Sequence, residues 1–281
     1  MKGYSHAITG AAAWTLVAAP DLPLREINPQ WWDVPLSLGL VETTPLGYAL
    51  GLVLASGAAL APDSDHHNGT IAHSLPKFLF LPSPTQVLCR AIGKVSGGHR
   101  HGTHSILGII IFTALAYLAG LWTVNIAGQD LSIGAGLVAL FLTAFALKVF
   151  KVGGSKDWFT RWFLSLVMAG AITWYFPNEW NILPIIVGLG CLAHCLGDML
   201  TVGGVPWLYP LNPKPPKFVQ KNPVLKRFWQ RNGWFAFPIL GKTDSGDEPS
   251  LTREKVLSFV LTVYIVAIGA LAGYYFIGLT L

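Results

Sequence analysis

The chain has 281 residues, of which 52% are hydrophobic and only 12% are charged, and its net charge is +5. A soluble globular domain carries about a quarter charged residues, so this composition excludes an ordinary soluble protein and indicates an integral membrane protein. The positive charge requires no nucleic-acid partner, because basic residues that face anionic lipid explain it.

Seven apolar stretches predict an all-α, polytopic membrane helix bundle of about seven helices in a single domain, residues 1–281. In chain order they are residues 5–20, 46–62, 105–122, 132–150, 160–177, 182–202 and 256–279. Several are close to the minimum length for crossing a bilayer, and the first two could be short or interfacial. The first is preceded only by Lys2 and interrupted by Thr9 and Gly10, which favours a retained helix over a secretory signal.

The basic residues of the connecting segments predict the orientation. If the N-terminus is cytoplasmic and all seven stretches cross, the inner segments are the N-terminus and residues 62–105, 148–161 and 203–255. All of the 19 Lys and Arg residues except Arg25 then lie on the inner side, as the positive-inside rule requires. Segment 203–255 is predicted to be a basic cytoplasmic interfacial loop, with a solvated loop as the alternative.

The eight histidines and the most prominent aspartates fall on this same inner side. Imidazole and carboxylate groups are ligands of catalytic zinc and of its neighbours in the transition series. Such groups are costly in an apolar protein unless something pairs with them. We therefore predict one site of one to three divalent ions, most readily zinc, with manganese or magnesium as alternatives. The clusters are His6; Asp63, Asp65, His66 and His67 with His73; His99, His101 and His104; and His194 with Asp198.

The spacing within two clusters suits metal binding. His194 and Asp198 are four residues apart, so on a helix they share a face, where both can bind one metal or the carboxylate can bridge two. A buried hydrogen-bonded pair is the alternative. Asp63 and Asp65 follow a helix-ending proline, and alternate residues of such a turn can point two carboxylates the same way.

The third cluster combines a turn with a helix start. Gly102 permits backbone conformations that are closed to other residues, and Thr103 or Ser105 can cap the next helix. His104 then lies where its ring can project towards the site. Arg100 presents a planar fork that suits phosphate or a developing oxyanion. A basic interfacial turn that binds lipid headgroups is the alternative.

These motifs, in this order, resemble those of the bacterial family of LexA-regulated inner-membrane metal-dependent hydrolases. The family pattern is an early His, then Asp-x-Asp-His, then His-Arg-Gly-x-Thr-His-Ser, then His-x-x-x-Asp-x-x-Thr before a Gly- and Pro-rich stretch. Where the family has Gly after Arg, this chain has His101 before Gly102, which leaves His99 or His101 as the functional imidazole. The counterparts, within residues 1–210, are His6; Asp63, Asp65 and His66; residues 99–105; and His194, Asp198 and Thr201 with residues 203–207.

More distantly, the His-x-x-x-Asp element and the separate aspartate are similar to those of zinc-dependent phospholipase C and related single-strand nucleases. Those enzymes build a cluster of metals from His and Asp on helices and cleave phosphate esters.

The resemblance implies a membrane-embedded metal-dependent hydrolase of the bacterial inner (plasma) membrane that cleaves a phosphoester of a lipid or lipid-linked substrate. A metal-ion transporter would instead place ionisable residues along a path between both faces. A structural metal site in a non-enzymatic membrane protein would close at four ligands. Arg100 is expected to steady phosphate charge, and His99 or a carboxylate not fully engaged by metal to act as general base. The expected catalytic residues are His99, Arg100 and Asp65, and the expected metal ligands are His6, Asp63, Asp65, His66, His104, His194 and Asp198.

Overall fold

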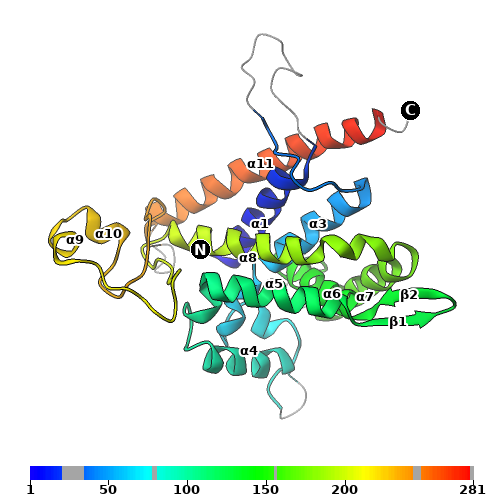
Figure 1. Ribbon diagram of the computed structural model, residues 1–281, viewed down its shortest axis with the longest axis horizontal. Helices are drawn as coiled ribbons and strands as arrows, with labels where there is room; N and C mark the ends of the chain where they lie inside the picture. Colours follow the sequence, from blue (N-terminus) through cyan, green and yellow to red (C-terminus); the bar gives the residue numbers. More distant parts are fainter. Residues whose placement is uncertain (21–34, 78–80, 155–156, 243–247, 279–281) are drawn as a thin grey trace, which may run out of the picture.

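A computed structural model of the chain describes residues 1–20, 35–77, 81–154, 157–242 and 248–278, which are mostly helical (Figure 1). Every one of the apolar stretches contains a helix, so the helical class is confirmed. These helices are α1 (Gly3–Ala18), α3 (Pro45–Ala58), α5 (Ile106–Gly120), α6 (Ile133–Val149), α7 (Trp158–Tyr175), α8 (Leu183–Met199) and α11 (Glu248–Gly278).

Three described helical segments are long and apolar enough to cross a membrane: Pro45–Asp65, Pro177–Met199 and Glu248–Gly278. Helices α5 and α6 are apolar but shorter. Length and composition therefore support a membrane protein, and seven crossings stay a prediction. Helix α11 begins at Glu248, so residues 248–255, expected in the basic loop, are helical.

A β-hairpin departs from the all-α prediction. Strands β1 (Thr123–Ile126) and β2 (Gln129–Ser132) pair antiparallel and join α5 to α6. Ala127 and Gly128 both have positive φ, 54° and 84°, which is the backbone of a two-residue type I′ hairpin turn. The sequence lacks the Asn-Gly or Asp-Gly signal for that turn, which is why the hairpin was not predicted.

The remaining described elements are short. Helix α4 (Pro84–Val95) is amphipathic and packs on two 3₁₀ turns, η1 (Ala61–Asp65) and η2 (Ile71–His73). The others are η3 (Gly102–His104), η4 (Pro177–Ile182), α9 (Lys217–Lys221) and α10 (Leu225–Phe228).

Small residues let α1, α3 and α8 approach closely. A Cβ added at Gly10 of α1 would lie 2.6 Å from the Ala59 Cβ, and one at Gly190 of α8 would lie 2.6 Å from the Ala58 Cβ. Glycine is therefore required at both positions for this packing, a use of small residues that is common between membrane helices. The end of α3 is consequently held between the two helices that carry His6 and His194.

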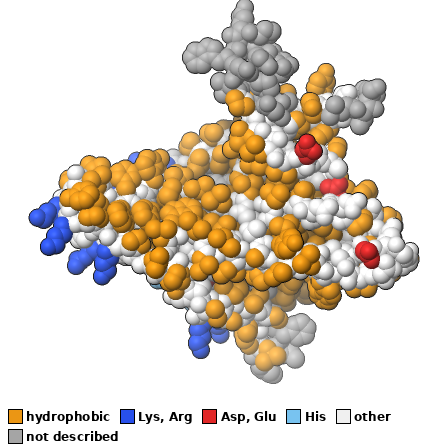
Figure 2. Space-filling model, viewed as in Figure 1, with side chains coloured by type: hydrophobic (Ala, Val, Ile, Leu, Met, Phe, Trp, Pro, Cys, Tyr) orange, Lys and Arg blue, Asp and Glu red, His pale blue; other side chains and the backbone are white. Residues whose placement is uncertain are grey.

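Charged side chains are distributed unevenly along the molecule. Figure 2 shows Lys and Arg at the end where α9 and α10 lie and also at the lower edge near α4, and Asp and Glu towards the hairpin end, with many hydrophobic side chains on the surface between. A hydrophobic band between polar ends is the arrangement expected of a protein embedded in a bilayer.

Candidate metal centre

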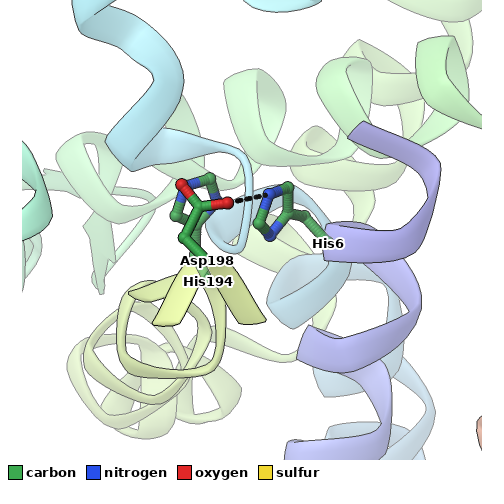
Figure 3. A group of neighbouring side chains, drawn as sticks. All are labelled: His6, His194 and Asp198. Carbon is green, nitrogen blue, oxygen red and sulfur yellow. Dashed lines mark ion pairs between the residues drawn. The ribbon is translucent and has the colours of Figure 1, made fainter. Parts of the chain in front are cut away.

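Four segments that are far apart in the sequence meet at one group of side chains. Helix α1 supplies His6, η1 supplies Asp63, η3 supplies His104, and the last turns of α8 supply His194 and Asp198. All of these except Asp63 are almost fully buried. In Figure 3, His6 faces Asp198 and His194 from the neighbouring helix.

Local structure fixes where each segment turns. Helix α3 ends at Ala58, and the proline-containing turn η1 follows. The Ser105 hydroxyl accepts a hydrogen bond from the Gly108 amide and caps α5, so His104 stands directly before a helix start. At the end of α8, the Thr201 hydroxyl donates to the carbonyl of Asp198 at 2.7 Å.

The hydrogen bonds of two imidazoles fix which ring nitrogen is free. His194 Nδ1 lies 2.6 Å from the carbonyl oxygen of Ala59, which only accepts, so this nitrogen carries the proton. His104 Nδ1 lies 3.0 Å from the Thr103 hydroxyl, which itself donates to Asp65. In the neutral rings, both Nε2 atoms therefore carry a lone pair.

These two Nε2 atoms face each other at 3.1 Å. Two lone pairs cannot form a hydrogen bond, so a cation is needed between them, either a proton on one ring or a metal ion. The site therefore has the chemistry of a cation site.

Two carboxylates lie close to the same pair of nitrogen atoms. Asp63 Oδ1 lies 3.6 Å from His104 Nε2 and 3.7 Å from His194 Nε2. Asp198 Oδ2 lies 3.7 Å and 3.8 Å from the same two nitrogens. Ligands at zinc bond lengths in a tetrahedron are about 3.4 Å apart, so the separations of 3.1–3.7 Å among Asp63, His104 and His194 fit one metal ion. Asp198 lies close to both imidazoles and forms a second possible metal group with His6 and His194.

His6 and Asp198 form a second group with His194. The His6 ring stacks on His194 with centroids 3.7 Å apart, and its Nε2 lies 3.3 Å from Asp198 Oδ1. His6 Nδ1 is buried without a hydrogen-bond partner among the described residues. A buried imidazole nitrogen with an open valence is available to a ligand.

Both carboxylate oxygens of Asp65 have hydrogen-bond partners within the protein. Oδ1 lies 2.8 Å from His99 Nδ1, while Oδ2 accepts from the Arg100 amide and the Thr103 hydroxyl and lies 3.4 Å from His104 Nδ1. A carboxylate used in this way orients imidazoles, as the outer partners of metal ligands do. Asp65 also forms a third possible metal group with Asp63 and His99.

The turn at residues 99–102 separates the two imidazoles between which the sequence could not choose. His99 bonds to Asp65, and its ring lies 5.5 Å from that of His104. His101 contacts Tyr209 and Trp234 instead. Arg100 has a φ of 60°, unusual for a residue other than glycine, and this conformation separates the two rings.

Arg100 extends into the site as a fork. Its Nε lies 3.1 Å from Asp198 Oδ2 and its Nη2 lies 3.2 Å from Asp198 Oδ1. The α-amino group of Met1 also bonds Asp198 Oδ1, at 2.7 Å. These two cations partly balance the carboxylates and hold Asp198 in place.

The remaining predicted residues lie outside this centre. His66 belongs to none of the three metal groups among the described residues, and its ring lies 4.6 Å from that of His99, so its ligand role stays a prediction. Cys191 and Cys195, on either side of His194 in the sequence, are fully buried. Neither the contact of the Met1 amino group with Asp198 nor the choice of Ser105 over Thr103 as the cap of α5 could be predicted from the sequence.

The site is electrostatically negative around His104, which precedes α5. Burial alone would lower the pKa of His104, but Asp63 and Asp65, with a contribution from Asp198, outweigh it and raise this pKa to about 9. At the rim, burial and the neighbouring His99 lower the pKa of His66. The carboxylates therefore favour a positive charge at His104, which a bound metal would supply in place of the proton.

Metal affinity is accordingly expected to increase with pH. Below pH 9 the metal-free site holds a proton on His104, and this proton must leave before the ring can bind a metal. Zinc affinity, measured by competition with a chromophoric chelator, should rise about tenfold per unit between pH 6 and pH 8. His67→Gln, which alters an imidazole outside the three groups, should keep the same slope; a flat profile would contradict the assignment.

One side of the centre is accessible. The Asp63 side chain is 24% exposed and that of His99 is 38% exposed, while His104 and His194 are completely buried. A ligand can therefore approach across Asp63 and His99. An accessible edge is a property of catalytic metal sites, whereas structural sites are closed.

Comparison with curated proteins and with solved structures gives no match. The sequence does match the family described as YdjM inner membrane protein, over residues 1–277. The match includes every residue of the metal groups and agrees with the apolar helices of the structure. The chain belongs to the YdjM inner membrane protein family.

Proposed function

We propose that this protein is a metal-dependent hydrolase of the inner membrane that cleaves a phosphoester of a lipid or lipid-linked substrate. The observation that carries the proposal is the group of three ligand atoms from Asp63, His104 and His194, which lie 3.1–3.7 Å apart beside an accessible edge. Three protein ligands and one open position are typical of catalytic zinc. Two neighbouring metal groups share residues with this group, which supports room for more than one ion. The mixed His/Asp set suits zinc best.

When bound, a divalent metal supplies Lewis-acid activation of a water molecule and of a phosphoryl oxygen. The chain supplies the remaining parts. Arg100 directs a bidentate donor towards the centre, where it can also pair with phosphate oxygens. His99 is accessible and has its Nδ1 held by Asp65, so its other nitrogen is available to take a proton.

We also propose that all seven helices of the apolar stretches cross the membrane, with the N-terminus and the metal centre on the cytoplasmic side. The positive-inside distribution supports this orientation, since Arg25 is the one basic residue that it leaves outside. The concentration of basic side chains at the α9–α10 end also agrees with it (Figure 2). The predicted ligands then lie near the inner membrane surface, where a phospholipid phosphate is located.

The proposal is tested by two substitutions in one turn. His99→Gln should lower the kcat for hydrolysis of a lipid phosphoester by about 10²–10⁴ while leaving the ion of the Asp63, His104 and His194 group bound, because His99 is a proton acceptor rather than a ligand of that group. His101→Gln is the matched control and should keep wild-type kcat, since His101 faces Tyr209 and Trp234.

The assay uses purified, metal-loaded protein with phospholipid and lipid-linked phosphate substrates, followed by release of water-soluble phosphate product. No hydrolysis by metal-loaded wild-type protein on any phosphoester lipid would overturn the enzymatic proposal and favour a structural metal site. Equal loss in both variants would refute the assignment of His99.

A further inference from the structure

A cavity separate from the metal centre lies in the segment that follows α8. Its volume is about 640 Å³, and its polar lining comes from Lys226, Arg227, Arg231, Gln220 and Gln230 together with the indole of Trp229. None of these residues belongs to the metal groups. A cavity of this size, lined by three cations, suits an anionic group larger than a simple ion.

The charge around this cavity is not compensated within its own segment. Between Asp198 and Asp244 the sequence contains no acidic residue. Arginine forks and lysine ammonium groups concentrated in this way attract anions, and phosphate is the anion whose oxygens they match best. The basic residues of the segment are Lys214, Lys217, Lys221, Lys226, Arg227, Arg231 and Lys242.

The walls of the cavity are fixed by hydrogen bonds. The Trp229 indole donates to the carbonyl of Pro213 at 3.0 Å, and its ring stacks on Phe235 with centroids 5.5 Å apart. The Gln230 amide donates to the carbonyl of Val202 at 2.7 Å. The cavity is thus a formed part of the fold, built where the segment folds back on the end of α8.

The segment that forms the cavity also exposes apolar side chains. Leu211, Phe218 and Ile239 are 84%, 68% and 55% exposed, and they lie in the same segment as the cations. Figure 2 shows hydrophobic side chains adjoining the Lys and Arg side chains at this end. Exposed apolar side chains in the same segment as a basic cavity fit a ligand that has an acyl chain as well as a phosphate.

The cavity also connects to the metal centre through a short stretch of chain. Val202, which lines it, follows Asp198 by one helical turn, so the two backbones are at most about 14 Å apart. A Cβ added at Gly203 would lie 3.3 Å from Arg100 Cζ. A lipid held in the cavity would therefore be close to the edge of the metal centre.

We propose that this cavity binds the phosphate headgroup of an anionic membrane phospholipid. The inference does not depend on hydrolysis, because it concerns a site made of other residues. The exposed apolar side chains distinguish a lipid from free phosphate or a nucleic acid, since neither of these would gain from contact with Leu211, Phe218 or Ile239.

The experiment compares two triple variants of the full chain in detergent, with lipid binding measured by native mass spectrometry. Lys226→Gln/Arg227→Gln/Arg231→Gln removes the cations of the cavity. Lys214→Gln/Lys217→Gln/Lys221→Gln removes the same charge from the same segment outside the cavity lining. Dioleoyl phosphatidylglycerol is the anionic probe and dioleoyl phosphatidylcholine the zwitterionic one.

The cavity variant should bind phosphatidylglycerol on the order of a hundredfold more weakly than wild type, and the control variant within about threefold of it. Wild type should prefer phosphatidylglycerol to phosphatidylcholine, and 10 mM inorganic phosphate should not displace it. The proposal would be overturned if both variants lost lipid binding equally or if wild type showed no preference for phosphatidylglycerol. It would also be overturned if inorganic phosphate displaced the lipid, or if an oligonucleotide bound more tightly than the lipid. Metal content should match wild type in both variants, so this test and that of the metal centre fail separately.

Discussion

His194→Ala is expected to abolish high-affinity metal binding. His194 Nε2 lies 3.1 Å from His104 Nε2 and within 3.8 Å of both carboxylates, and His194 belongs to two of the three metal groups. Loss of an outer hydrogen-bond partner costs metal affinity about 10–100-fold, and loss of a ligand itself should cost more. Elemental analysis of the purified protein should find the metal in wild type and not in the variant.

The same experiment has a stability readout. With free zinc about 100-fold above its dissociation constant, binding stabilises the wild-type fold by about 2.7 kcal/mol, which a chelator removes. The unfolding temperature of His194→Ala should not respond to the chelator, while that of Cys195→Ala, altered at the next residue, should respond as wild type does. Metal retained by His194→Ala, or no metal and no chelator effect in wild type, would exclude the site.

Gly10→Ala and Gly190→Ala are expected to disturb the fold and the metal centre together. The added methyl groups would collide with the end of α3, at Ala59 and at Ala58. Overpacking of this kind costs about 1–3 kcal/mol, which corresponds to a fall of roughly 3–10 °C in the unfolding temperature. Because Gly10 lies one turn from His6 and Gly190 one turn from His194, metal affinity should fall on the order of tenfold as well.

Gly170→Ala provides the matched control. This glycine lies within helix α7, and a Cβ added there meets nothing within 4 Å. Alanine is also the better helix former, so this variant should be as stable as wild type or slightly more stable. Thermal unfolding in detergent and metal content check both sets; wild-type behaviour of Gly10→Ala would show that α1 and α3 are less closely packed than described.

The helices of this chain could be predicted where contact with lipid requires an almost entirely apolar sequence. The run from Ile106 to Gly120 is almost entirely apolar, and it forms α5. Helix α4 was not predicted, because it is short and amphipathic, with polar residues interrupting its apolar ones, and it packs on η1 and η2. Helix length alone does not separate a crossing helix from a shorter one held inside the bundle, so the number of crossings could not be derived from the apolar runs.

The sequence was enough to predict which residues form the candidate site, but not which role each of them has there. The predicted membrane topology alone was enough to place His6, His104 and His194 at the same depth in the membrane. The structure brings these side chains together with Asp63 and Asp198. That Asp65 orients two imidazoles depends on hydrogen bonds to His99 and Thr103, whose directions no spacing reveals. The separation of His99 from His101 likewise depends on a positive φ at Arg100.

The order of the ligands along the chain has a consequence for biogenesis. His6 is synthesised first and Asp198 almost 200 residues later, which at about 5–20 residues per second is an interval on the order of ten seconds or more. Throughout that interval, α1 and η1 carry polar groups whose partners have not yet been made. Metal acquisition would therefore be a late event, possible only after α8 has been inserted beside α1, and a nascent chain that stalls earlier would remain without metal.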